Sequence, residues 1–172
     1  MSSSRKVIDG RANFAAKMEP KFEWVNVRQI IDKTFASLAP FVWSHGVKLV
    51  ADVSRDLGVV ADRGMLSSAV LNLAQNAIDA MPQGGRLEVT ACVGRGGLEL
   101  EIADSGPGLN DEMLRRAFEP FFTTKPGALG LGLALVRRIA AVHGGDVLAV
   151  NCPEGGAAFT LRFPQRALRA AA

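Results

Sequence analysis

The sequence of 172 residues predicts an α+β protein, a two-layer α/β sandwich in which helices lie on one face of a mixed, mostly antiparallel sheet. Apolar residues recur at helical spacing in three long segments, and the shorter runs between these segments are typical of strands. Clusters of glycine and proline mark turns that separate them. The length and the hydrophobic content of 48% fit one compact domain with a buried core.

The first half of the chain contains two of the expected helices. Residues 1–22 have mixed polarity and no sustained period, so we interpret them as a linker or the remnant of an upstream helical hairpin. Asn26 is a suitable N-cap for the apolar residues that follow at helical spacing. Pro82 marks the end of the second helix. The expected elements are a helix over 26–45, a strand over 47–53, a short apolar run over 59–61 and a helix over 66–81.

The second half is expected to contribute more strands than helices. A glycine-rich stretch over 105–130 separates a hairpin from the third helix. The expected elements are hairpin strands over 87–93 and 98–103, a helix over 131–143, and closing strands over 147–151 and 157–163. The domain is therefore placed at 23–164, with a C-terminal tail over 165–172.

Composition excludes several classes of protein. No window approaches the roughly 18 apolar residues of a membrane span, so we expect a soluble fragment without membrane contact. Cys92 and Cys152 lack CxxC spacing, which argues against a zinc site or a disulfide framework and favours the reducing cytoplasm. The net charge of +3 is small, and its basic residues lack aromatic interleaving. Nucleic-acid binding is not predicted.

Two asparagines lie four residues apart on the second expected helix. Asn72 and Asn76 share one face because successive residues turn by about 100°. Asparagine is a poor helix former, so the pair indicates either a bound ligand or local caps on the backbone. An amide oxygen suits Mg²⁺, which uses few protein ligands together with waters and phosphate oxygens. The pair alone leaves both interpretations open.

Two glycine-containing turns could also bind a ligand. Asp104 follows a strand directly, where its carboxylate could accept a hydrogen bond from an exocyclic amine. Gly106 and Gly108 would let the backbone approach a flat ring closely. Gly130 and Gly132 open the third helix, where unpaired N–H groups and the helix dipole favour an anion. Each turn alone is equally compatible with an ordinary structural role.

Four segments follow one another along the chain: 71–81 (LNLAQNAIDAM), 104–108 (DSGPG), 118–125 (FEPFFTTK) and 130–133 (GLGL). In combination they resemble the N, G1, F and G2 boxes of sensor histidine kinases, in the variant of the nitrogen-regulatory subfamily. The resemblance covers roughly 23–164. It implies the Bergerat ATP-binding fold of the GHKL superfamily.

The resemblance also implies a role for each motif. ATP would lie between the second and third helices, with Asn76 holding Mg²⁺, Asn72 supporting the phosphates and Asp104 accepting from adenine. Residues 109–129 would form a mobile lid, with Lys125 contacting the outer phosphates. The lid would be anchored by the burial of Phe118, Phe121 and Phe122. The other implied ATP contacts are Asp79, Gly106, Gly108, Leu109, Gly130, Leu131 and Gly132.

Four positions depart from the family's pattern. Ala128 and Leu129 stand where many members carry a glycine and a phosphate-contacting threonine, and Ala128 would strain the lid and weaken nucleotide binding if a positive φ were needed there. Asp79 stands where many subfamilies carry a basic residue, so the basic role would pass to Lys125. Asn72 stands where hydrolytic relatives carry a glutamate, and an amide cannot act as a general base. Rapid ATP hydrolysis is therefore not expected.

The implied activity is transfer of the γ-phosphate of ATP to a histidine on a separate dimerisation and phosphoacceptor hairpin. A response regulator would be an indirect partner. His45 and His143 each precede glycine at a helix end and are expected to pack or cap, so the hairpin is expected upstream of Arg5 and the chain is expected to be a truncation. The alternative is a non-catalytic, nucleotide-responsive module whose altered lid binds nucleotide weakly.

Overall fold

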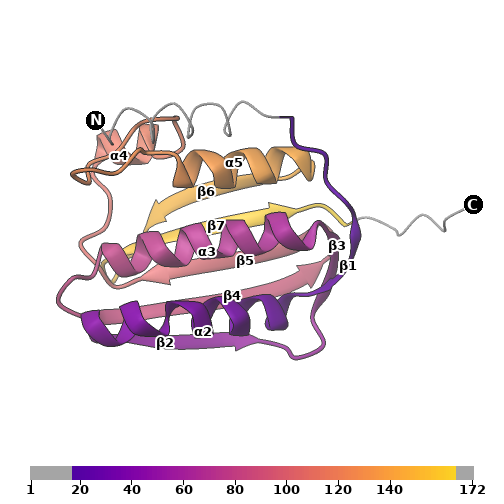
Figure 1. The fold of residues 1–172 in the computed structure, drawn as a ribbon, viewed down its shortest axis with the longest axis horizontal. Helices are drawn as coiled ribbons and strands as arrows, with labels where there is room; N and C mark the ends of the chain where they lie inside the picture. The colour runs from indigo at the N-terminus through magenta and orange to yellow at the C-terminus, as the bar shows by residue number, and fades with distance from the viewer. Residues whose placement is uncertain (1–16, 166–172) are drawn as a thin grey trace, which may run out of the picture.

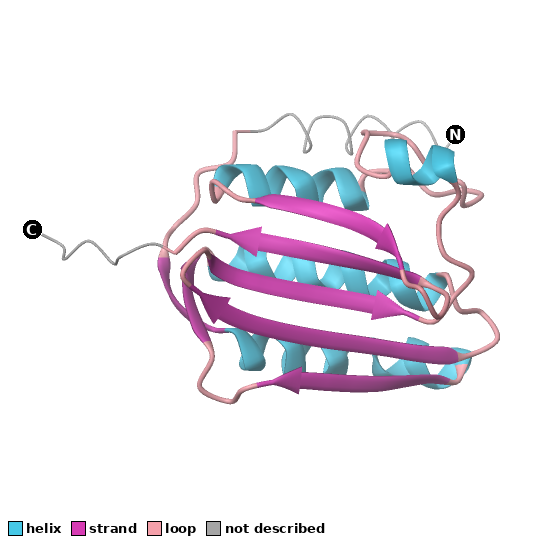
Figure 2. Cartoon of the chain, turned by 180° about the vertical axis from the view of Figure 1, so that it is seen from behind, coloured by secondary structure: helices cyan, strands magenta, loops and turns pink. Residues whose placement is uncertain are grey.

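The computed structural model describes residues 17–165 and has two layers, with helices packed on one face of a five-stranded sheet (Figure 1). Figure 2, seen from behind, shows the opposite face of this sheet in front of the helices. The strands lie in the order β2 (Val47–Val53), β4 (Gly85–Gly94), β5 (Gly97–Asp104), β7 (Ala157–Phe163) and β6 (Asp146–Asn151). Among the described strands, only β2 and β4 pair in parallel. The predicted fold class is confirmed.

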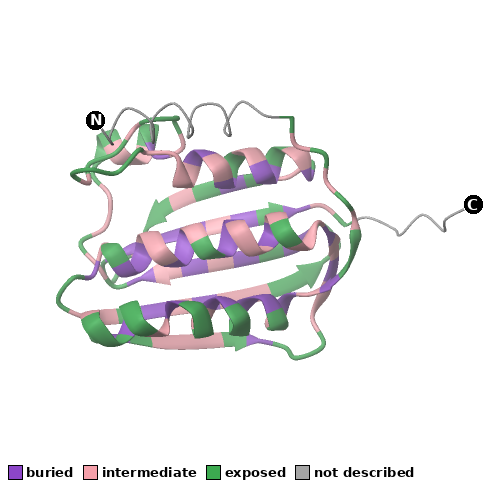
Figure 3. Cartoon of the chain, viewed as in Figure 1, coloured by how far each residue is buried: buried purple, intermediate pink, exposed green. Residues whose placement is uncertain are grey.

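Three long helices cover the sheet: α2 (Val27–His45), α3 (Arg63–Asp79) and α5 (Gly132–Val142). The central helix, α3, packs against both of the others (Figure 1). Its apolar side chains, such as Leu66, Leu73 and Ile78, are fully buried against the sheet. Figure 3 shows buried residues along α3 and the central strands, whereas α2 presents many exposed residues. The core therefore holds the position of α3 firmly.

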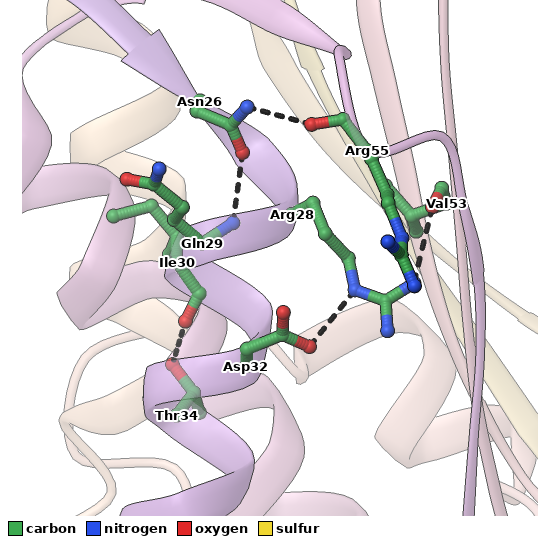
Figure 4. A network of polar contacts seen from close by, with 8 residues as sticks. All are labelled: Asn26, Arg28, Gln29, Ile30, Asp32, Thr34, Val53 and Arg55. Carbon is green, nitrogen blue, oxygen red and sulfur yellow. Dashed lines mark hydrogen bonds and ion pairs between the residues drawn. The ribbon is translucent and has the colours of Figure 1, made fainter.

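Polar contacts set the start of α2 (Figure 4). Asn26 Oδ1 accepts from Gln29 N at 2.9 Å, as an N-cap does, and Asn26 Nδ2 donates to Arg55 O at 2.7 Å. In the first turn of the helix, Arg28 Nε donates to Asp32 Oδ1 at 2.8 Å. The cap predicted at Asn26 is confirmed. The side chain also joins the helix to the loop after β2.

Two short elements were not predicted from the sequence. β1 (Glu23–Asn26) pairs antiparallel with β3 (Gly58–Ala61), and a strand of four residues is too short to show alternation. α4 (Asp111–Arg116) lies within residues 109–129, the stretch expected to form a mobile lid, for which no helix was predicted. Its Asn110 cap accepts from Met113 N at 2.9 Å, and its acidic first turn and basic last turn match the helix dipole.

His143 lies in the core at the end of α5 and is 1% exposed. Its Nε2 accepts from Asp62 N at 3.0 Å, and its Nδ1 lies 2.8 Å from Ile139 O. The ring stacks on Phe163 with centroids 4.1 Å apart, and the edge of Phe22 meets it at 5.3 Å. The packing role predicted for His143 is confirmed.

The predicted linker and tail fall mainly outside the described residues. Of the linker, residues 17–22 lie against the domain, where Lys21 N donates to Asp62 Oδ2 at 2.7 Å. Within the part of the chain that the structure describes, no helix is long and apolar enough to cross a membrane.

Candidate functional site

A cavity of ≈ 220 Å³ opens between the C-terminal half of α3, the lid and the first residues of α5. These three segments meet at one end of the sandwich (Figure 1). Seven of the predicted ATP contacts line the cavity: Asn72, Asn76, Asp79, Leu109, Lys125, Gly130 and Gly132. Asp104, Gly106, Gly108 and Leu131 do not line it. The structure therefore gathers most of the residues predicted to contact phosphate around one cavity, whereas Leu109 alone of those predicted to border adenine lines it.

The two asparagines of α3 differ in what they bind. Asn72 Nδ2 donates to Ser68 O at 2.7 Å. This is a local hydrogen bond to the backbone, one of the two interpretations that the sequence left open for the asparagine pair. Asn72 Oδ1 faces the start of α5, because a Cβ placed on Gly132 would lie 2.9 Å from that oxygen. Asn76 Oδ1 instead accepts from Lys125 Nζ at 2.8 Å. The amide oxygen of Asn76 thus faces the lid and the cavity.

The ammonium group of Lys125 lies between two side-chain oxygens of α3. Lys125 Nζ contacts Asn76 Oδ1 at 2.8 Å and Asp79 Oδ2 at 3.0 Å. Gln75 Nε2 donates to Asp79 Oδ1 at 2.8 Å and fixes the orientation of that carboxylate. Amide and carboxylate oxygens are the hard donors that Mg²⁺ prefers, so this pair fits a magnesium ion. Within residues 17–165, no three His, Cys, Asp or Glu side chains gather as an alternative metal site.

Asp104 ends β5 and is 6% exposed. Its Oδ1 accepts from Gly106 N at 2.9 Å and from Ala157 N at 3.4 Å, whereas no described group donates to Oδ2. Burial raises the pKa of Asp104, although those two N–H groups and the charge of Lys125 act in the opposite direction. A buried carboxylate with one unused oxygen can accept a hydrogen bond from a ligand.

The glycines after Asp104 are needed for contacts within the chain. A Cβ on Gly106 would lie 2.8 Å from Asp104 Oδ1. Gly108 has a φ of +77°, and a Cβ there would lie 2.9 Å from Asn151 Oδ1. The close approaches of the backbone at these two glycines are to groups of the protein itself, and the approach to a flat ring stays a prediction.

The lid returns to α5 through Gly130. This residue has a φ of +65°, and a Cβ there would lie 2.6 Å from Phe122 O. Phe121 is the only described residue other than glycine with a positive φ, so Ala128 does not lie in the left-handed region. The lid strain that the sequence suggested for Ala128 is therefore absent. Leu131 precedes α5 without a side-chain cap, which leaves N–H groups at the helix start open to an anion.

The three phenylalanines of the F box lie in different environments. Phe118 is half-buried and meets the ring of core residue Phe159 edge-on at 6.2 Å, as an anchor would. Phe122 is half-buried, lines the cavity and lies under the guanidinium of Arg116 at 4.4 Å. Phe121 is 46% exposed, so its predicted burial is wrong. At a φ of 68° its N–H donates to Gly130 O at 2.9 Å, and this backbone geometry leaves the ring at the surface.

Some residues near the cavity carried no clear signal in the sequence. Gln75 and Met113 line it, and both resemble ordinary helix residues. Thr123 and Thr124 also line it, and hydroxyls inside the F box could have suggested this. Asn151 bonds the backbone of Leu109 from the end of β6, where a polar residue before a turn is unremarkable.

Comparison with protein families matches residues 61–167 to the model described as "Histidine kinase-, DNA gyrase B-, and HSP90-like ATPase". The chain belongs to this family. Within it, the chain is 31% identical over 163 residues to the C4-dicarboxylate transport sensor protein DctS of Rhodobacter capsulatus, covering 92% of this chain and 25% of the relative. It is 36% identical over 164 residues to the sensor protein FixL of Bradyrhizobium diazoefficiens, covering 92% and 32%. The chain thus spans a third or less of these relatives.

Solved members of the family have the same architecture. The catalytic domain of histidine kinase ThkA matches with a TM-score of 0.77 and 28% identity, covering 84% of this chain and 96% of that one. Full-length ShkA in complex with AMPPNP matches with a TM-score of 0.80 and 30% identity, covering 97% and 36%. The Bergerat fold is confirmed, and the domain is homologous to the catalytic ATP-binding domains of sensor histidine kinases.

Proposed function

We propose that this domain transfers the γ-phosphate of ATP to a histidine on a separate dimerisation and phosphoacceptor hairpin. The observation that carries the proposal is the convergence of Asn76, Asp79 and Lys125 on one point of the cavity, with contacts of 2.8 and 3.0 Å. Catalysis of phosphoryl transfer is chiefly positioning and charge stabilisation, and these groups supply both.

Each group has a proposed role. Asn76 would hold Mg²⁺, with Asp79 beside it, and the ion would neutralise charge on the phosphates. Lys125 would contact the outer phosphates, and Asn72 would support the phosphate end through its contact with the start of α5. Asp104 would accept from adenine N6 through the oxygen that no described group uses. Of the other predicted contacts, Gly106, Gly108 and Leu109 would border the base, and Gly130, Leu131 and Gly132 would present backbone N–H groups to phosphate.

The wider assignment follows from the family. A two-component pathway implies a response regulator as an indirect partner and a cytoplasmic location. The wording of residues 76–81 favours the nitrogen-regulatory subfamily, although the matched relatives are varied sensor kinases. The non-catalytic alternative depended on the altered lid at Ala128 and Leu129. The strain suggested for Ala128 has no support in the backbone angles, and nothing else in the described part of the chain favours this alternative, so we do not propose it.

Radiolabelling with γ-³²P-ATP tests the proposal. The isolated chain should bind ATP without labelling itself, because His143 is 1% exposed and His45 Nδ1 lies against Phe41 O at 2.9 Å, at the end of α2. Addition of a dimerisation and phosphoacceptor hairpin from a sensor histidine kinase of the family should give acid-labile label on the hairpin. Labelling of the isolated chain, or no label on the hairpin despite measured ATP binding, would contradict the proposal.

A further inference from the structure

We propose that Asn151 is a positioning residue for the nucleotide site, and that it fixes the position of Leu109, the first residue of the lid. Its Oδ1 accepts from Leu109 N at 2.7 Å, and its Nδ2 donates to Leu109 O at 2.7 Å. Leu109 lines the cavity. Both polar groups of its peptide backbone are therefore bound by a single side chain from a distant part of the chain.

The sheet cannot hold Leu109 in this place by itself. β5 ends at Asp104, and its neighbour β7 begins at Ala157, so backbone pairing stops before the turn is complete. Asn151 is the last residue of β6, and β7 separates that strand from β5 in the sheet. Its side chain bridges this gap. A carboxamide suits the task because it carries one donor group and one acceptor, like the peptide group of a paired strand.

The turn after β5 and the turn after β6 pack closely against each other. A Cβ on Gly108 would lie 2.9 Å from Asn151 Oδ1, and one on Gly156 would lie 1.8 Å from Asp104 O. The turn after β6 is closed by Cys152 N, which donates to Gly156 O at 3.0 Å. Asn151 thus belongs to a unit that includes the carboxylate proposed to bind adenine.

The rest of the lid follows directly after Leu109, the residue whose backbone Asn151 binds. Asn110 follows Leu109 and caps α4, accepting from Met113 N at 2.9 Å. The hydrogen bonds from Asn151 fix the position of Leu109, and therefore the position at which α4 begins. The lid residues beyond α4 would remain able to close on a ligand. Asn151 would therefore lower the conformational cost of forming the site without touching the nucleotide.

The inference rests on the proposed ATP site, and a set of variants tests it. Asn151→Ala removes both hydrogen bonds, and Asn151→Asp keeps the acceptor for Leu109 N while removing the donor. Loss of two neutral hydrogen bonds should weaken ATP binding about ten-fold in the alanine variant, and at least as much in the aspartate variant, whose second carboxylate oxygen would face the acceptor Leu109 O. Glu154→Ala, an exposed change in the same turn, is the matched control and should leave affinity unchanged.

Calorimetry, thermal unfolding and amide hydrogen exchange together separate positioning from general destabilisation. Asn151 is exposed, so the melting temperature of Asn151→Ala should change little, while exchange at the Leu109 amide should accelerate and exchange at Phe159 in β7 should not. Unchanged ATP affinity with accelerated exchange at Leu109 would overturn the positioning role. So would equal acceleration at Leu109 and Phe159. Absence of ATP binding by the parent chain would instead overturn the proposed function.

Discussion

Lys125 Nζ lies 2.8 Å from Asn76 Oδ1, although the two residues are 49 positions apart in the sequence. The same ammonium lies 3.0 Å from Asp79 Oδ2. The ammonium group of Lys125, in the lid, therefore binds Asn76 Oδ1, the oxygen that is proposed to hold the metal ion. Two cations repel each other at such short range, so Mg²⁺ on Asn76 requires Lys125 to move toward the phosphates.

Lys125→Met should change the affinity for ATP and the affinity for ADP differently. We expect ATP binding in the presence of Mg²⁺ to weaken about ten- to a hundred-fold, because a charge-assisted hydrogen bond to the outer phosphate is lost. ADP binding should stay equal or become tighter, because Asn76 and Asp79 no longer carry a competing cation. Calorimetry with both nucleotides measures the split, and Lys48→Met on β2 is the control. Equal weakening for ATP and ADP would contradict this role.

Asn76→Ala should remove the part of ATP binding that depends on metal. Titrations of ATP with Mg²⁺ and with a chelator give that part for each variant. In the parent chain Mg²⁺ should strengthen binding, whereas in the variant the two titrations should agree. If Mg²⁺ strengthens binding equally in both proteins, Asn76 is not the ligand.

Asp104→Asn should weaken ATP binding and leave the fold intact. The variant keeps Oδ1 as acceptor for Gly106 N and Ala157 N but replaces the second oxygen with an amide that cannot accept. We expect a loss of about ten- to a hundred-fold in affinity. Since burial raises the pKa of Asp104, the ionised form is disfavoured in the fold, and removing it should leave stability at pH 7 equal or higher. An unchanged affinity in the folded variant would refute the adenine contact.

Gly130→Ala and Gly127→Ala form a matched pair in the lid. Both glycines have a positive φ, of +65° and +75°, but a Cβ would clash at Gly130 and would meet nothing within 4 Å at Gly127. Each change should cost about 1–2 kcal/mol of local conformational energy, and Gly130→Ala should cost more because of the clash. ATP affinity should follow that order. Ala128→Gly should have little effect, since Ala128 lies outside the left-handed region.

Asp62 should make the stability of the domain depend on pH. Burial raises the pKa of Asp62, but N–H groups of Met65, Lys21 and Gly64 together with His143 outweigh it, so the pKa is lowered overall. A lowered pKa means that Asp62 contributes stability above its unfolded pKa, and that this contribution is lost as pH falls through the folded pKa.

Asp62→Asn tests this dependence, because asparagine keeps the helix cap but cannot accept from Lys21 N with its amide nitrogen. At pH 7 the variant should be less stable by about 1 kcal/mol, and the difference should shrink as pH falls through the lowered pKa of Asp62 in the fold. Urea unfolding at a series of pH values measures it, with Asp56→Asn as an exposed control. A difference that is constant with pH would show that the charge of Asp62 is not involved.

Local pattern was sufficient for most elements of this fold. The apolar spacing after Asn26 and the cap itself predicted α2, because a helix is built from contacts within four residues. Strand β2 was predicted at its observed bounds, Val47–Val53, for a similar reason. Elements with little internal signal were missed, as β1 and α4 show: one is held by pairing with β3, and the other is a single short segment of the lid.

By itself, the sequence determined the family and the residues of the N box, G1 box, F box and G2 box, because these motifs are contiguous and their order can be read directly. Only the tertiary structure decided how they meet. It placed Lys125 on Asn76, left Phe121 exposed, and bound Leu109 through Asn151, 42 positions away. Such contacts depend on where the sheet brings distant segments together. No spacing in the chain encodes them.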